Sequence, residues 1–202
     1  MGQAVDIPNN RRIIGLTGGI ASGKSTVSDY LASQYGLPVL DADVYSREAV
    51  EKGSEILAAI AHRYGAQILH PNGTLNRSKL GAIIFNNNTE KQWVEQQIHP
   101  FVRSRFATTA ATLSPSQTLV YSIPLLFEAN LAHLVTEVWV VYCTPQQQQA
   151  RLMARNQLSA SEAQLRIAAQ MPLKEKCDLA DCLLDNTQGK EVLFEQIDQL
   201  LS

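Results

Sequence analysis

Short apolar runs alternate along the chain with longer stretches in which apolar residues recur every three or four positions. Short runs rich in β-branched and aromatic residues are typical of buried strands, and the three-to-four spacing is typical of helices with one buried face. Because the two kinds of segment alternate, we expect an α/β fold with a five-stranded, mostly parallel sheet. The expected strands cover residues 13–17, 38–40, 118–123, 137–143 and 179–184.

The helical stretch between the second and third expected strands is unusually long, at about residues 54–113. Asn86–Asn88 break its helical pattern, Thr89 and Gln92 then have capping-box spacing, and Pro100 should interrupt the helix that follows. A simple crossover between parallel strands needs far fewer residues. We therefore expect a helical subdomain that receives a second substrate, with its Trp and Phe side chains mainly in its core.

Two helix starts follow the fourth expected strand. Thr144 precedes Pro145, with Gln147 at the capping-box position, and Ser159 and Glu162 repeat the capping-box spacing further on. These signals predict a helix-loop-helix segment over about residues 145–176.

That segment is basic, and Arg151 and Arg155 lie four positions apart on one face of its first helix. Like charges at this spacing weaken an isolated helix, which favours an anionic partner, although a solvated face with local ion pairs is the alternative. On the first interpretation the segment is a lid that closes over bound phosphates.

A phosphate-binding motif joins the first expected strand to the first helix. The chain reads G-x-x-x-x-G-K-S from Gly18 to Ser25, which is the P-loop pattern in its strand, loop and helix context. Glycines turn backbone N–H groups toward an anion, and the helix dipole adds to the attraction. The expected nucleotide contacts are Gly18, Gly19, Ile20, Ala21, Ser22, Gly23, Lys24, Ser25 and Thr26.

Within this motif, Lys24 is expected to reach the β- and γ-phosphates of ATP, and the Ser25 hydroxyl to ligate Mg²⁺. A glycine-rich turn with a chance Lys-Ser pair, or a loop that binds nucleotide without catalysis, is the alternative. The first interpretation makes the protein a phosphotransferase.

Two carboxylates, Asp41 and Asp43, follow the second expected strand. The carboxyl ends of parallel strands are the ligand-binding side of such a sheet, so these residues should lie beside the P-loop. They face the same way only if the strand continues through Asp43, and a helix start capped by one of them is the alternative. Arg47, four residues after Asp43, is either its ion-pair partner or an anion contact.

Composition narrows the function classes. The chain has 202 residues, with 17 Lys and Arg against 19 Asp and Glu, so nothing indicates a nucleic-acid-binding arm or a polybasic membrane patch. No apolar run approaches the roughly 18 to 20 residues of a membrane span. The three cysteines have no zinc-like spacing, which favours buried thiols in a reducing compartment. We expect a cytoplasmic protein with no nucleic-acid or membrane partner, and a loose extension at residues 1–10.

Together these motifs resemble the dephospho-coenzyme A kinase family over residues 13 to about 188. The resemblance implies a single P-loop kinase domain over residues 11–202, of the nucleoside-monophosphate-kinase type, with a helical substrate-binding insertion and a lid. The stretches that carry it are Leu16–Thr26, Asp41–Asp43 with Arg47, Gly73–Arg77, His99-Pro100, Pro124–Glu128, Arg151 with Arg155, Arg166 with Gln170, and Ala180–Asn186.

The resemblance implies transfer of the ATP γ-phosphate to the ribose 3′-hydroxyl of dephospho-coenzyme A, with ATP and Mg²⁺ required. It implies that Asp43 is the base or orients the hydroxyl and contacts the metal with Ser25, that Lys24 and Arg155 act on the phosphates, and that Asn186 lies near the ATP base. The implied acceptor-binding residues are Thr17, Asp43, Arg47, His99, Pro124, Leu125, Phe127 and Glu128.

The sequence departs from the family pattern at Asn76 and Asn156, where the family usually has Asp. Contacts at these positions are therefore not carried over.

We expect the protein to be a monomer.

Three other functions remain open on the residues alone. A kinase of another small hydroxyl acceptor, such as a nucleoside or a shikimate-like molecule, would share the P-loop and the early Asp. A GTP-binding switch lacks support because the chain has no Asn/Thr-Lys-x-Asp motif for guanine. A nucleotide-binding interaction module would not need Lys24, Ser25, Asp43 and Arg155 together.

Overall fold

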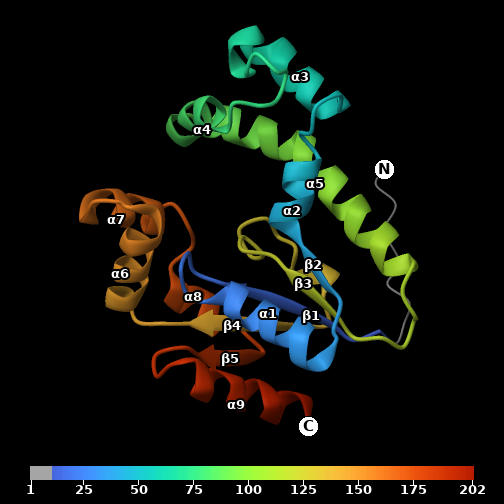
Figure 1. Ribbon diagram of the computed structural model, residues 1–202, viewed down its shortest axis with the longest axis vertical. Coiled ribbons are helices and arrows are strands. Elements are labelled where there is room, and N and C mark those ends of the chain that lie inside the picture. The colour runs from blue at the N-terminus through green and yellow to red at the C-terminus, as the bar shows by residue number, and fades with distance from the viewer. Residues whose placement is uncertain (1–10) are drawn as a thin grey trace. The chain divides into compact units, whose positions relative to one another are not determined.

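Five parallel strands form one sheet in the order β2-β3-β1-β4-β5 (Figure 1). The computed structural model describes residues 11–202, so the expected extension at residues 1–10 lies outside the described residues. The prediction of a five-stranded α/β fold is confirmed, and every pairing in the sheet is parallel. The strands are β1 (Ile13–Gly18), β2 (Val39–Asp41), β3 (Leu119–Ser122), β4 (Glu137–Tyr142) and β5 (Cys182–Asp185).

The helices begin close to their sequence signals. Thr144 and Ser159 each form a complete capping box, with Gln147 and Glu162 respectively, as predicted. The helices are α1 (Lys24–Tyr35), α2 (Ala42–Glu48), α3 (Glu55–Tyr64), α4 (Arg77–Asn86), α5 (Asn88–Ala111), α6 (Pro145–Asn156), α7 (Ala160–Ala168), α8 (Leu173–Asp178) and α9 (Lys190–Leu201).

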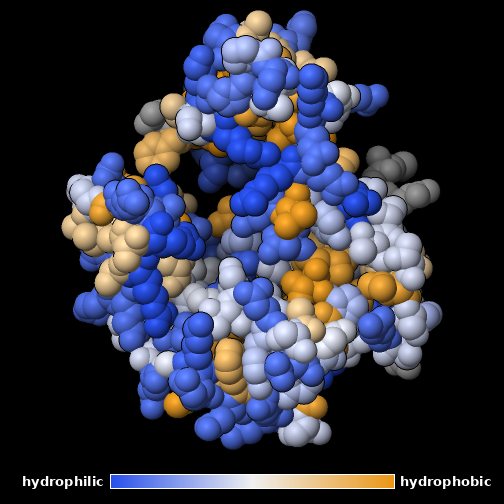
Figure 2. All heavy atoms as spheres, in the orientation of Figure 1, coloured by the Kyte–Doolittle hydropathy of each residue, from blue (hydrophilic) through white to orange (hydrophobic). Residues whose placement is uncertain are grey.

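The chain divides into two compact units. The sheet unit comprises the described residues up to Asp41 together with Leu113–Ser202, and the helical unit comprises Ala42–Thr112. The helical unit therefore starts earlier than the expected insertion at residue 54, because α2 packs against α5 within it. Hydrophilic residues dominate the face of the helical unit that Figure 2 shows.

In the sheet unit, α1 and α9 cover one face of the sheet. Every second side chain along each strand points to that face, because successive side chains of a strand point to opposite faces of the sheet. The resulting core is fully buried, which is the main source of stability of such a layered fold. Its members are Ile14, Leu16, Val27, Leu31, Val120, Trp139, Val141, Leu184, Leu193 and Ile197.

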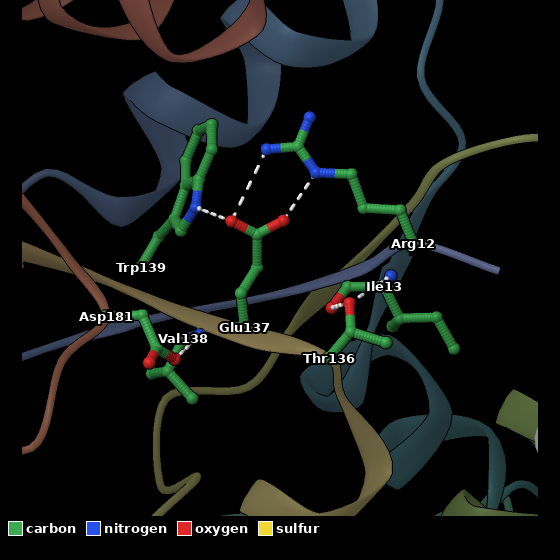
Figure 3. Close-up of polar contacts among 7 residues, drawn as sticks. All are labelled: Arg12, Ile13, Thr136, Glu137, Val138, Trp139 and Asp181. Atoms are coloured by element: carbon green, nitrogen blue, oxygen red, sulfur yellow. Dashed lines mark hydrogen bonds and ion pairs between the residues drawn. The ribbon is translucent and has the colours of Figure 1, made fainter. Parts of the chain in front are cut away.

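Charged and polar side chains join the amino ends of adjacent strands at the edge opposite the P-loop (Figure 3). The guanidinium of Arg12, just before β1, donates to both carboxylate oxygens of Glu137 at the start of β4, and Trp139 Nε1 donates to Glu137 Oε2 at 2.9 Å. Burial alone would raise the pKa of Glu137, but the hydrogen bonds from Arg12 and Trp139 outweigh it and lower the pKa. The network thus fixes the β1–β4 pairing at its start.

The three cysteines are free thiols. Cys143 is buried, and Cys177 and Cys182 are partly buried. Burial raises the pKa of each thiol above its ordinary value, so all three are protonated at neutral pH.

Two predictions for the helical unit were wrong. Asn87, not Thr89, caps α5, because its side chain accepts from Thr89 N and Glu90 N. The helix also continues through Pro100 instead of stopping there. Val94, Val102 and Phe106 are buried along α5 on both sides of the proline, and this packing outweighs the lost backbone hydrogen bond.

An ion-pair network joins α3 to the start of α5 within the helical unit. Arg63 donates to both oxygens of Glu90 at 2.7 and 2.9 Å, and Tyr64 Oη donates to Glu90 Oε2 at 2.7 Å. The Arg63 guanidinium also lies 4.5 Å from the centre of the Trp93 ring. The hydrogen bonds from Arg63 and then from Tyr64 lower the pKa of Glu90 to about 2.

This network predicts an acid-sensitive contribution to stability. Because the pKa of Glu90 is lower in the folded chain than its ordinary 4.5, the contribution is present above pH 4.5 and is lost as the pH falls toward about 2. Glu90→Gln should lower the urea midpoint at pH 7, and the difference from wild type should shrink across that pH range. Circular dichroism at several pH values measures it.

Glu55→Gln is the matched control, since Glu55 is an exposed acid in the first turn of α3. It should leave the midpoint nearly unchanged at every pH. A Glu90→Gln deficit that stayed constant from pH 7 to pH 2 would contradict the assignment.

Candidate active site

The P-loop lies between β1 and α1, and its shape requires glycine at two crowded positions. A Cβ on Gly19 would lie 2.4 Å from Gln148 Nε2, and a Cβ on Gly23 would lie 2.1 Å from Asn186 Nδ2. Gly23 also has φ 111° as the N-cap of α1, a conformation that L side chains rarely adopt. Ala21 has φ 60°, so a non-glycine residue is held in the left-handed region at the turn.

Side chains from the second half of the chain hold the P-loop main chain. Gln148 Nε2 donates to Ile20 O at 2.9 Å, and Ile20 N donates to Gln170 Oε1 at 2.9 Å. Asn186 Nδ2 donates to Ser22 O at 2.8 Å. These bonds fix three peptide groups of the loop, so protein side chains hold the loop conformation.

Arg151 belongs to the same set of contacts. Its guanidinium donates to Ser22 O at 3.4 Å and to Asn186 O at 3.0 Å. The anionic partner expected for Arg151 stays a prediction, and in this structure its guanidinium supports the P-loop backbone. Asn186, expected near the ATP base, is buried and supports the loop as well.

Lys24 lies beside two polar side chains at the carboxyl ends of neighbouring strands. Lys24 Nζ donates to Ser122 Oγ at 2.5 Å, and Ser122 Oγ donates to Asp41 Oδ2 at 2.8 Å. Lys24 Nζ also lies 3.7 Å from Asp41 Oδ2. The three residues therefore form one polar cluster, which joins the start of α1 to the carboxyl ends of β2 and β3.

Ser122 was not among the predicted site residues. Its position as the final residue of β3 was the available signal, because β3 lies next to β1 and parallel strands present their carboxyl ends at one edge. The sheet register brings Asp41 level with Ser122, and Ser122 level with Leu16.

The alternatives for the Asp41–Asp43 stretch are settled in favour of a helix start. The strand β2 ends at Asp41, and α2 begins at Ala42. Asp43 therefore lies in the first turn of α2 as an exposed side chain of the helical unit, and Arg47 is in the last turn of the same helix. Asp41 remains at the sheet edge, where it faces Lys24.

Some of the predicted acceptor-binding residues on β1 and after β3 form hydrogen bonds or ion pairs within the sheet unit. Thr17 Oγ1 donates to Pro124 O at 3.2 Å, which joins the end of β1 to this loop. Glu128 Oε1 pairs with Lys176 Nζ at 2.8 Å and accepts from Met171 N at 3.0 Å. Leu125 is an exposed apolar side chain, and Phe127 is half-buried.

Two further predicted residues lie on helices. Arg155 is exposed near the end of α6, where its Nε donates to Asn156 Oδ1 at 2.9 Å. His99 lies within α5, and burial lowers its pKa, partly opposed by Glu95 and assisted by Arg103. The imidazole is therefore neutral at pH 7.

The oxygen donors near the P-loop suit a magnesium ion. The Ser25 hydroxyl is exposed in the first turn of α1, and the Asp41 carboxylate lies at the neighbouring sheet edge. Mg²⁺ takes oxygen ligands and keeps several waters when it binds beside phosphates, so a few protein oxygens suffice. Within residues 11–202, three or more His, Cys, Asp or Glu side chains do not gather into a metal cluster.

The chain is similar to known dephospho-CoA kinases over nearly its whole length. The family model for dephospho-CoA kinase matches residues 12–191. The chain is 60% identical over 180 residues to the dephospho-CoA kinase of Synechocystis sp., which covers 89% of this chain and 90% of that protein. The family-model match includes the whole helical unit and the sheet unit up to the start of α9.

Two solved structures share the fold. A protein from Thermus thermophilus superposes with a TM-score of 0.82 at 32% identity, over 96% of this chain and 97% of that one. The dephospho-CoA kinase from Campylobacter jejuni superposes with a TM-score of 0.69 at 26% identity, over 94% of each chain.

The crowded glycine at the start of α1 allows a matched test of the P-loop. Gly23→Ala should weaken nucleoside triphosphate binding by about tenfold or more, because the new Cβ collides with Asn186 and the main chain must shift where anion-binding N–H groups need exact placement. Fluorescence titration with a labelled ATP analogue measures the affinity.

Gly36→Ala is the control at the other end of the same helix. Gly36 has φ 61° and nothing within 4 Å of a Cβ, so this variant adds only backbone strain of roughly 1–2 kcal/mol. It should lower the melting temperature and leave nucleotide affinity nearly unchanged. Equal affinity losses in both variants would refute the role assigned to the crowded loop.

Proposed function

The chain belongs to the dephospho-CoA kinase family, which catalyses the final step of coenzyme A synthesis with ATP, and we propose how its residues divide that reaction between them. The observation that carries the proposal is the Lys24–Ser122–Asp41 cluster behind a P-loop whose main chain is already held in place. This arrangement supports ATP as the phosphate donor, and membership of the family points to the ribose 3′-hydroxyl of dephospho-CoA as the acceptor.

On the donor side, the P-loop N–H groups and the start of α1 bind the phosphates of ATP. Lys24 leaves Ser122 and Asp41 and turns to the β- and γ-phosphates. Its ammonium is mostly buried, with 14% of the side chain exposed, so its charge acts with little screening by water. Phosphoryl transfer depends mainly on positioning and on neutralising the negative charge of the phosphates.

On the acceptor side, Asp43 orients or deprotonates the 3′-hydroxyl. Its place in the first turn of α2, directly after the strand that carries Asp41, supports this role. Arg47 on the same helix and His99 on α5 belong with the acceptor. The neutral imidazole of His99 suits a hydrogen bond to the acceptor rather than a contact with an anion.

The loop Pro124–Glu128 also belongs to the acceptor side. It follows the carboxyl end of β3, at the sheet edge that holds the P-loop, and Thr17 bonds directly to it. Its exposed Leu125 offers an apolar contact to the acceptor.

The α6–α7 segment is the lid. Arg155 must leave Asn156 to reach the transferred phosphate, and an exposed arginine near a helix end can do so at little cost. Closure over the acceptor also excludes water, which would otherwise accept the phosphate.

The Ser25 hydroxyl and a carboxylate, Asp43 in our assignment, would hold Mg²⁺. An ion held by these residues would supply positive charge against the phosphate oxygens.

Localisation and assembly are separate proposals. None of the described helices has both the length and the apolarity needed to cross a membrane. We infer a monomer that works in the cytoplasm. Gel filtration with light scattering would test the assembly state.

A coupled assay for ADP with dephospho-CoA and ATP tests the function directly. The wild-type protein should phosphorylate dephospho-CoA in preference to nucleosides or shikimate, with ATP preferred over GTP. Lys24→Ala should abolish transfer. Preference for another acceptor, or full transfer by Lys24→Ala, would overturn the proposal.

Asp43→Asn tests the assignment of the acceptor side. The change should lower kcat by about 10²- to 10⁴-fold, as expected for loss of a general base, with ATP affinity within about twofold of wild type. Steady-state kinetics and a direct ATP titration separate the two effects. Near-normal turnover would remove Asp43 from the mechanism, and Glu51→Gln, an exposed acid just beyond α2, is the control that should remain fully active.

A further inference from the structure

Lys176 is a fully buried lysine that the proposed chemistry does not use. Its side chain, on α8, has no exposed surface. Its Nζ donates to Pro124 O at 2.9 Å and pairs with Glu128 Oε1 at 2.8 Å. The ammonium therefore holds both ends of the Pro124–Glu128 loop.

Residues just before Lys176 contact the same surroundings. Gln170 Oε1 accepts from Ile20 N in the P-loop, and Met171 N donates to Glu128. Leu173 Cδ1 lies 3.6 Å from the position that a Cβ on Gly19 would occupy. The segment Gln170–Lys176, which we call the junction, thus touches the P-loop at one end and the Pro124–Glu128 loop at the other.

The chemistry of the buried lysine indicates positioning rather than simple packing. Removing an ammonium from water is costly, and an apolar side chain of similar volume often stabilises a core equally well. An ammonium, however, makes directional bonds, and here they reach a main-chain carbonyl and a carboxylate of one loop. Pro124 O also accepts from Thr17 Oγ1, so the same carbonyl is tied to the end of β1.

We propose that the junction is a positioning element for both substrates, in which Gln170 places the P-loop for ATP and Lys176 places the Pro124–Glu128 loop for dephospho-CoA. The proposal rests on the function assigned above. Both residues lie in the stretch that connects α7 of the lid to β5 of the sheet, so lid position and loop position are linked through it.

Variants of Gln170 and Lys176 should raise KM for different substrates. Gln170→Ala removes the acceptor of the Ile20 N–H and should raise KM for ATP about tenfold, with KM for dephospho-CoA within about twofold. Lys176→Met keeps most of the volume and removes both bonds to the loop. It should raise KM for dephospho-CoA about tenfold, with KM for ATP within about twofold.

Matched controls come from α8, which carries Lys176, and from α7, which precedes Gln170. Lys174→Met removes an exposed lysine from α8, and Gln164→Ala removes an exposed glutamine from α7. Both should have wild-type constants. Lys176→Arg keeps a cation with several donors and should recover at least half of the lost acceptor affinity, which a merely space-filling role would not require.

A second variant covers the case in which Lys176→Met does not fold. Glu128→Gln breaks the same ion pair from its more exposed partner, keeps an acceptor for Met171 N, and should also raise KM for dephospho-CoA selectively. Parallel changes in both KM values, or a lower melting temperature with unchanged constants, would overturn the proposal. The assay of the wild-type protein tests the function separately, because absence of transfer by the wild type would refute the proposed function and not only the role of the junction.

Discussion

The P-loop can present its N–H groups to phosphate only if its other peptide groups are held by the protein. Backbone donors and acceptors need partners when they leave water. Here Gln148 bonds the carbonyl of Ile20 and Gln170 bonds its N–H, while Asn186 and Arg151 bond the Ser22 carbonyl. The crowding of Gly19 and Gly23 follows from these supports, so the glycines make room for protein side chains as well as for a ligand.

The sheet supplies the second part of the site. Parallel strands bring their carboxyl ends to one edge, and the order β2-β3-β1 places Asp41 and Ser122 beside the strand that leads into Lys24. The lysine is therefore paired with side chains of both β2 and β3. An unpaired ammonium with this little exposure would be costly, and Ser122 and Asp41 offset that cost with a hydrogen bond and an opposite charge.

The charges of the segment that precedes β5 serve structure as well as binding. Arg151 supports the P-loop, and Lys176 supports the loop after β3, whereas Arg155 is exposed and paired only with its neighbour Asn156 among the contacts the structure describes. The basic character of this stretch had suggested either an anionic partner or a solvated face. Arg151 and Lys176 both bond to main-chain carbonyls inside the sheet unit, and Lys176 also forms a buried ion pair with Glu128.

Local signals in the sequence were sufficient for the strands, the P-loop and the capping boxes of α6 and α7, because each depends on residues close together in the chain. The break at Asn86–Asn88 was also readable, although the pattern did not show that Asn87 makes the capping bonds to Thr89 N and Glu90 N. The continuation of α5 through Pro100 depended on packing of its buried side chains against other elements. Contacts over long separations were beyond such reading: Ser122 meets Lys24, Gln170 meets Ile20, and Lys176 meets Pro124 only after the sheet has formed. Residue type and spacing thus determined which chemistry the chain carries, and the tertiary structure decided which side chains hold it in place, since hydrogen bonds form only between groups that the fold brings within about 3 Å.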